Sequence, residues 1–257
     1  LVEEGARMSA EQFLGGEQAI VDEDLEFPLL GLLTPVGGDE FRFFTDRDFH
    51  SIGELLALTV GFAVALLASV SGLLIGLVSG TMRRADSIIM RIMDGLMSIP
   101  PILLAIALMA LTRASVENVV IAITIAEIPR VSRLVRGVVL TLREQAYVDA
   151  AISCGCRMPM LIWRHILPNT LAPLTVQATY ICASAMITES ILSFIGAGVP
   201  PIIPSWGNIM ADGRTLFQIK PYIIFFPAVF LSVTVLAVNL LGDGFRDVLD
   251  PRKSKSA

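Results

Sequence analysis

Residues 52–78 read IGELLALTVGFAVALLASVSGLLIGLV and carry one charged side chain, Glu54. A helix of about 20 consecutive apolar residues is long enough to cross a bilayer core, so this stretch predicts a transmembrane helix. Gly72, Gly76 and Gly80 repeat at every fourth residue and share one face of that helix. Such a stripe of small residues lets another helix approach closely in lipid, although glycine is also common in membrane helices without that role.

The composition of the whole chain agrees with a membrane protein. Of its 257 residues, 54% are hydrophobic and 17% are charged, whereas about a quarter are charged in soluble domains. This balance excludes a disordered chain, a nucleic-acid binder and an ordinary soluble enzyme. Further apolar stretches lie at 92–111, 119–134, 171–194 and 222–241. The sequence therefore predicts an all-α polytopic membrane helix bundle with about five spans.

The first 51 residues differ from the rest, because they hold 12 acidic and 3 basic side chains. Their apolar stretch at 27–36 is too short to span a membrane. They also lack the basic start of a signal peptide. We expect segment 1–51 to be extracytoplasmic or poorly ordered, and the transmembrane domain to occupy 52–250.

Basic residues predict the orientation of the spans. Thirteen of them lie in 79–94, in 130–170 and after residue 241, against three in the loops 112–118 and 195–221. Because basic loops stay in the cytoplasm, the C-terminus and the tail 251–257 are expected there. The acidic first segment then lies outside and would have to cross without a preceding helix. A first span missing from this sequence is the simpler account.

The loop 138–170 predicts two short helices along the membrane surface. Residues 143–153 are good helix formers, and Gly155 can end that helix in a left-handed conformation. Pro159 suits the first turn of a second helix, which Pro168 is expected to end before the fourth span. One face of the first helix is small and apolar and suits docking into a groove of another protein; the alternative is a surface helix packed on its own bundle. That face consists of Tyr147, Ala150, Ala151 and Cys154.

The motif Asp149-Ala150-Ala151, followed by Gly155 and Leu167-Pro168, resembles the EAA loop of ABC-importer permeases, with Asp where Glu is commoner. The segments RHILPN (164–169), ESILSFIG (189–196), PSWG (204–207) and NLLGDGFRDVLDP (239–251) resemble the "C" type permease of the dipeptide/oligopeptide/nickel group. The resemblance covers residues 52–251 and implies a MetI-like, type I importer fold. The first helix of the family has no counterpart in this sequence.

The resemblance implies a subunit of an ATP-driven importer that moves di- or oligopeptides across a bacterial inner membrane by alternating access. Its implied partners are a homologous permease subunit in a heterodimer, two ATP-binding cassette subunits, an extracytoplasmic solute-binding protein and the lipid bilayer, and no nucleic acid. Alternatives are an importer of nickel complexes, opines or sugars with the same architecture, a degenerate non-transporting membrane subunit and, more distantly, an intramembrane enzyme. The ATPase-coupling residues implied are Glu144, Tyr147, Asp149, Ala150, Ala151, Gly155, Leu167 and Pro168.

Other polar residues lie at the ends of the predicted spans. Arg91 and Asp94 are three residues apart, which suits an ion pair within one helix or a contact with the ATPase. Glu189 lies within the fourth span, where a carboxyl group is costly in lipid. We expect it to serve the transport pathway or helix packing, and the alternative is an interfacial group.

The outward loop 195–221 and its neighbours supply candidates for docking of the binding protein. They are Pro204, Trp206 and Arg214, and the tryptophan is equally typical of a membrane-interface anchor.

Catalytic and metal-binding motifs are missing from the sequence. It has no Gly-rich phosphate loop ending in Gly-Lys-Ser/Thr, so ATP and Mg are expected on the partner subunits. Two histidines, His50 and His165, and the pair Cys154-Gly-Cys156 do not make a closed zinc site. We therefore expect no enzymatic activity and no cofactor on this chain.

Overall fold

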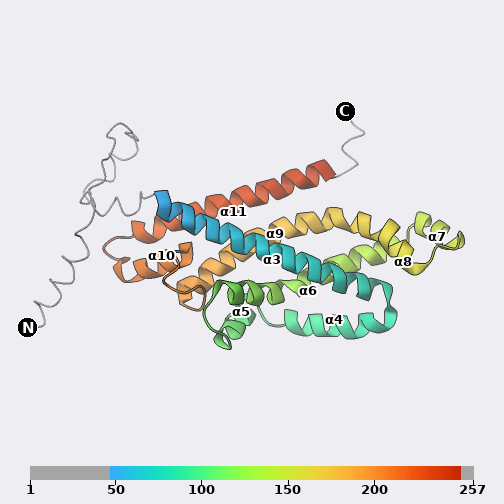
Figure 1. The fold of residues 1–257 in the computed structure, drawn as a ribbon, viewed down its shortest axis with the longest axis horizontal. Helices are drawn as coiled ribbons and strands as arrows, with labels where there is room; N and C mark the ends of the chain where they lie inside the picture. The colour runs from blue at the N-terminus through green and yellow to red at the C-terminus, as the bar shows by residue number, and fades with distance from the viewer. Residues whose placement is uncertain (1–46, 250–257) are drawn as a thin grey trace, which may run out of the picture. The chain divides into compact units, whose positions relative to one another are not determined.

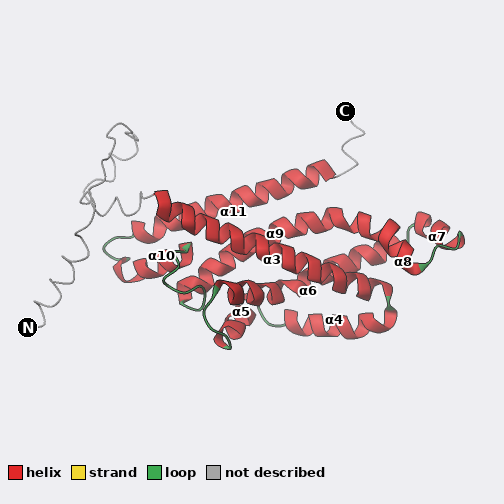
Figure 2. Cartoon of the chain, viewed as in Figure 1, coloured by secondary structure: helices red, strands yellow, loops and turns green. Residues whose placement is uncertain are grey.

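The computed structural model describes residues 47–249. Within them every regular element is a helix and no strand is present (Figure 2), which confirms the all-α prediction. The predictions for 1–46 and for the tail 251–257 lie outside the described residues. The elements in chain order are α3 (Arg47–Thr81), α4 (Arg83–Met97), α5 (Pro101–Ala110), α6 (Val116–Arg143), α7 (Ala146–Ser153), α8 (Met158–Leu161), the π-helical turn η2 (Ile162–Ile166), α9 (Leu167–Ile195), α10 (Trp206–Asp212), the 3₁₀ turn η3 (Gly213–Leu216) and α11 (Tyr222–Leu249).

Three helical stretches are long and apolar enough to cross a membrane: Gly53–Thr81, Met158–Ile195 and Tyr222–Arg246. The pair α4 and α5 adds a fourth if it is counted as one broken span. The helix α6 is long enough as well, but Glu127, Arg130 and Arg133 interrupt its apolar stretch. The predicted third span, 119–134, lies inside α6 and ends too early, because the helix continues to Arg143.

The second predicted span, 92–111, is divided between two helices at Pro100-Pro101. The helix α4 ends at Met97, α5 begins at Pro101, and the two meet at an angle of 86°. Proline lacks the backbone N–H that would continue a helix and restricts the residue before it. The pair Pro100-Pro101 therefore breaks the apolar stretch instead of bending it.

The helices α3 and α6 approach closely along the glycine stripe. A Cβ atom built on Gly72 would lie 2.5 Å from the Cβ atom of Val131, and one built on Gly76 would lie 2.6 Å from that of Val135. A Cβ atom on Gly80 would likewise lie 2.6 Å from Cγ1 of Val139. Three glycines at four-residue spacing thus face three valines at the same spacing. These contacts support helix packing as the role of the glycine stripe, over a chance abundance of glycine.

The described bundle has two different ends (Figure 1). The helices α7 and α8 and the turn between α3 and α4 lie at one end, and α10 lies at the other with the beginnings of α3 and α11. Each long helix therefore joins the two ends. The helix α3 packs mainly against α6 and α9, and α9 also packs against α10 and α11.

Candidate functional site

The short helix α7 presents an exposed face. Val148 is its buried residue and packs the helix onto the bundle, whereas Tyr147, Asp149, Ala150 and Cys154 are exposed. Ala151 is half-buried. Within the described residues, the predicted docking face is thus largely exposed, and Val148 on the opposite side of α7 packs the helix onto the bundle.

The end of α7 has the backbone that the sequence predicts. Gly155 has a φ of +82°, in the left-handed region. The N–H of Cys156 donates to the carbonyl of Ala151 over 3.0 Å, and the N–H of Gly155 donates to that of Ile152 over 2.9 Å. These bonds satisfy the last carbonyls of the helix, so the predicted role of Gly155 as the stop is confirmed.

The beginning of α7 differs from the prediction. The expected helix over 143–153 starts only at Ala146, because Arg143 is the last residue of α6. Glu144 caps the C-terminus of α6 and therefore lies in the turn and outside α7. The turn is short, so α6 and α7 are joined almost directly.

The sequence predicted that Pro168 ends a helix, and this prediction is wrong. Pro159 does lie in the first turn of α8, as expected. The chain runs from α8 through the π-helical turn η2 into α9, and Pro168 occupies the first turn of α9. A π-helical turn changes the backbone register, so the missing N–H of Pro168 causes no break. Leu167 is half-buried and Pro168 is exposed.

Two weak contacts connect α7 with the start of α9. The rings of Tyr147 and His165 have centroids 6.4 Å apart. The side-chain nitrogen of Asn169 lies 3.5 Å from the hydroxyl of Tyr147 and donates to the carbonyl of His165 over 2.7 Å. Asn169 is a site residue that the sequence reading missed, because its partner is 22 positions away.

The predicted ion pair between Arg91 and Asp94 is wrong. Asp94 pairs with Arg133 on α6, and Arg91 has no ion pair among the described residues. A second carboxylate of α4, Asp86, accepts two hydrogen bonds from the guanidinium of Arg136, over 2.5 and 2.7 Å. The spacing of residues within α4 cannot show these pairs, because both cationic partners lie on another helix.

Glu189 is the centre of a buried hydrogen-bond network at the other end of the bundle. Its side chain is 0% exposed. The hydroxyl of Ser193 donates to Oε1 over 2.8 Å, and Ser190 and Ser205 also contact the carboxyl group. Since Ser205 caps α10, where its hydroxyl accepts from the N–H of Asn208, Glu189 joins α9 to α10. The burial and these contacts favour helix packing over an exposed interfacial group, the alternative in the sequence.

The loop before α10 is shaped by the same network. The hydroxyl of Ser193 accepts a hydrogen bond from the N–H of Val199 over 3.2 Å. The side-chain amide of Asn208 donates to the carbonyls of Val199, Pro200 and Ile203. One side-chain amide therefore fixes three backbone carbonyls of the loop. Ile202, at the tip of the loop, is exposed.

Trp206 does not present its ring to a partner. The ring is 2% exposed, stacks on Phe230 of α11 with centroids 5.8 Å apart, and faces Gly53 of α3. Its predicted roles in docking or as an interface anchor are wrong for the described chain, because the ring lies in the packing between three helices. Pro204 is half-buried. Arg214 is exposed, with its guanidinium 4.7 Å from the ring centre of Phe194, and donates to the carbonyl of that residue.

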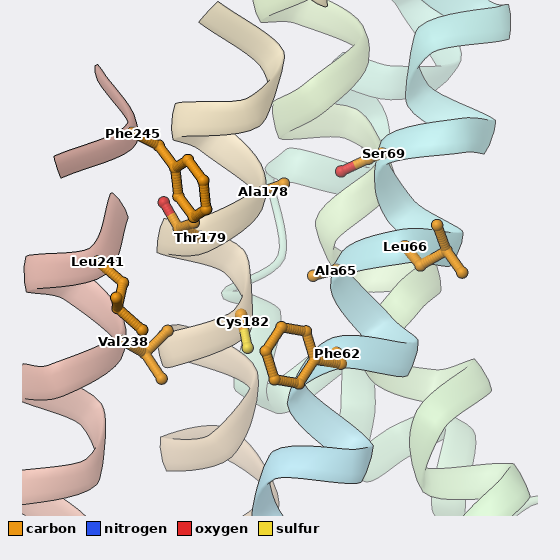
Figure 3. A pocket seen from close by; sticks show the side chains of 10 residues that line it. All are labelled: Phe62, Ala65, Leu66, Ser69, Ala178, Thr179, Cys182, Val238, Leu241 and Phe245. Carbon is orange, nitrogen blue, oxygen red and sulfur yellow. The ribbon is translucent and has the colours of Figure 1, made fainter. Parts of the chain in front are cut away.

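An apolar pocket of about 280 Å³ lies between α3, α9 and α11 (Figure 3). The sequence reading missed it, because its side chains are ordinary for membrane spans. The pocket is lined by Phe62, Ala65, Leu66, Ser69, Ala178, Thr179, Cys182, Val238, Leu241 and Phe245.

No group of His, Cys, Asp and Glu in the described residues could hold a metal ion.

Comparison with solved structures supports the fold. The chain superposes on an inward-facing conformation of the MetNI methionine ABC transporter with a TM-score of 0.65 and 18% identity, over 79% of this chain and 97% of that one. A crystal structure of an amino acid ABC transporter with histidines gives a TM-score of 0.63 at 17% identity, over 84% of this chain and all of that one. At such identities the likeness concerns the fold alone.

Comparison of sequences identifies the family. A protein of Sinorhizobium fredii, named Probable peptide ABC transporter permease protein, is 55% identical over 203 residues, which make up 79% of this chain and 70% of that protein. The dipeptide transport system permease protein of Alkalihalophilus pseudofirmus is 40% identical over 78% of this chain and 66% of its own length. Residues 72–255 match the family model described as binding-protein-dependent transport system inner membrane component. The chain therefore belongs to this family of inner-membrane permease subunits of ABC importers.

Proposed function

We propose that the chain is one of two membrane-spanning subunits of an importer that takes up di- and oligopeptides, driven by ATP hydrolysis on partner subunits. The observation that supports coupling to the ATPases is the exposed face of α7. Val148 packs this helix onto the bundle, and Gly155 ends it. The names of the relatives, which include peptide and dipeptide permeases, support the peptide cargo. Nothing in the described residues favours nickel complexes, opines or sugars over peptides.

The partners follow from this function. Two ATP-binding cassette subunits dock on α7 through Tyr147, Asp149, Ala150 and Ala151, and they bind ATP and Mg, whereas this chain binds no cofactor. A homologous permease completes the pathway as a heterodimer. The α7 end and the C-terminus face the cytoplasm, and segment 1–51 lies outside.

The extracytoplasmic solute-binding protein docks on the loop 196–205 and the nearby Arg214. Glu189 positions this loop through Ser193 and Ser205. The glycines at 72, 76 and 80 allow α3 and α6 to move as one packed pair. Closure of the ATPases displaces α7, and the resulting population shift between two packings opens the pathway on the other side.

Reconstitution tests the proposal. The chain is purified with a homologous permease, two ATPase subunits and a solute-binding protein and placed in liposomes with a radiolabelled dipeptide. We expect uptake that requires ATP and the binding protein. Failure of the ATPases to copurify, or ATP hydrolysis without uptake of dipeptides or longer peptides, would contradict the peptide-importer function. Uptake of a nickel complex, an opine or a sugar in place of peptides would support the alternative cargo.

Labelling tests the orientation. A cysteine replaces Lys255 in a chain whose three natural cysteines are serines. We expect an impermeant thiol reagent to label it only after the cells are opened. Labelling in intact cells would reverse the proposed topology.

A further inference from the structure

The helix α4 is a short rod between two breaks in the chain. At its beginning Met82 is extended, with φ of −113° and ψ of 100°, and separates α4 from α3. At its end the chain turns by 86° into α5. Met93 is the buried residue of α4, whereas Ile88 and Ile92 are exposed. Packing alone therefore holds α4 weakly.

Two ion pairs hold α4 onto α6. Arg136 contacts both carboxylate oxygens of Asp86, and these side chains are 31% and 22% exposed. Arg133 pairs with Asp94, where the side chains are 50% and 60% exposed. A two-pronged Arg–carboxylate contact defines direction as well as distance, so Asp86–Arg136 is the more specific of the two. We call these two pairs the α4 clamp.

The same stretch of α6 is tied to α3 and leads into α7. Arg143 donates to the carbonyl of Gly80 over 2.9 Å, near the C-terminus of α3. Arg143 is also the last residue of α6, and α7 begins at Ala146. A displacement of α7 therefore acts first on the part of α6 that carries the α4 clamp.

We propose that the α4 clamp makes α4 follow α6 when the coupling helix α7 moves, so that Asp86 and Arg136 are positioning residues for transport. This rests on the proposed function, in which α7 docks on the ATPases. The two breaks let α4 change its angle to α3 and α5, and the clamp selects the angle. Partly exposed ion pairs add little to stability, which separates this role from a purely structural one.

The first test compares dipeptide uptake per ATP hydrolysed in the reconstituted complex. We expect Asp86→Asn and Arg136→Gln to keep ATP hydrolysis and to lower this ratio by about two- to thirtyfold, the range in which residues between coupled sites commonly act. The exchanged pair, Asp86→Arg with Arg136→Asp, should recover most of the ratio. Arg84→Gln is the matched control, because it removes one exposed charge from the same helix without breaking an ion pair that the structure describes.

A wild-type ratio in both single variants would overturn the proposal. So would impaired single variants that the exchanged pair does not rescue, since this would show that the contact itself is not responsible. Absence of uptake by the wild-type complex would instead refute the proposed function.

A second measurement does not depend on the cargo. Spin labels at positions 88 and 140, both exposed, report the distance between α4 and α6 in the complex with and without ATP. We expect one narrow distance in both states for the wild type and a broad distribution for Asp86→Asn. A wild-type distance that changes with ATP would show that α4 does not follow α6.

Discussion

The two ends of the described bundle are held by different kinds of contact. At the α7 end, arginines of α6 reach partly exposed carboxylates on α4, and the face of α7 is open. At the α10 end, Glu189, Ser193, Ser205 and Asn208 form a buried network. Buried hydrogen bonds are costly to break, whereas exposed ion pairs are exchanged readily for water. The comparison indicates a rigid α10 end and an adjustable α7 end.

The largest loss of stability is expected at the rigid end. Glu189→Ala removes the acceptor of Ser193 and the contacts with Ser190 and Ser205. We expect the free energy of unfolding to fall by about 3 kcal/mol, since each buried group left unsatisfied costs about 1–3 kcal/mol. Thermal unfolding of the purified complex measures it, with the exposed Glu117→Ala as control. Equal stability of the two variants would remove the distinction between the ends.

A smaller loss is expected between the ends, where α3 meets α6. Gly76→Leu forces a side chain against Val135, because even its Cβ atom would lie 2.6 Å from the Cβ atom of that valine. Overpacking of this kind costs about 1–3 kcal/mol. Gly95→Leu is the matched control, since a Cβ atom there meets no described atom within 4 Å. If both variants unfold at the same temperature, the close packing of α3 on α6 is not required.

At the α7 end we expect a small stability effect and a large functional one. Gly155→Ala places a side chain at a φ of +82°, which costs about 1 kcal/mol. It should tilt the end of α7 and lower uptake per ATP, as should Ala151→Glu, which adds a charge to the docking face. Gly155→Asn is the control, because asparagine tolerates the left-handed conformation. Variants that import like the wild type would make α7 an ordinary surface helix.

The smallest effect is expected for Asp94→Asn. Its pair with Arg133 is half-exposed, so the unfolding free energy should change by less than about 1 kcal/mol. Thermal unfolding of Asp94→Asn and Glu189→Ala, measured in parallel, compares the stability that each end of the bundle contributes. A loss as large as that of Glu189→Ala would mean that the α7 end is as rigid as the α10 end.

The sequence predicts local features of the fold well and contacts between distant segments poorly. The left-handed Gly155 and the first-turn Pro159 are properties of neighbouring residues, and they were predicted correctly. The partner of Asp94 was not, because Arg133 lies 39 positions away on another helix. Trp206 was misjudged for the same reason, since Phe230 and Gly53, which bury its ring, belong to other helices.

The equal spacing of glycines on α3 and valines on α6 also limits how the gene can change. One residue inserted between Gly72 and Gly76 would turn the rest of α3 by about 100° and replace the glycines at the contact by larger side chains. An insertion of four residues, a little more than one turn, would restore nearly the same face. The length of this segment is therefore open to change in steps of about one helical turn and closed to single-residue insertions and deletions.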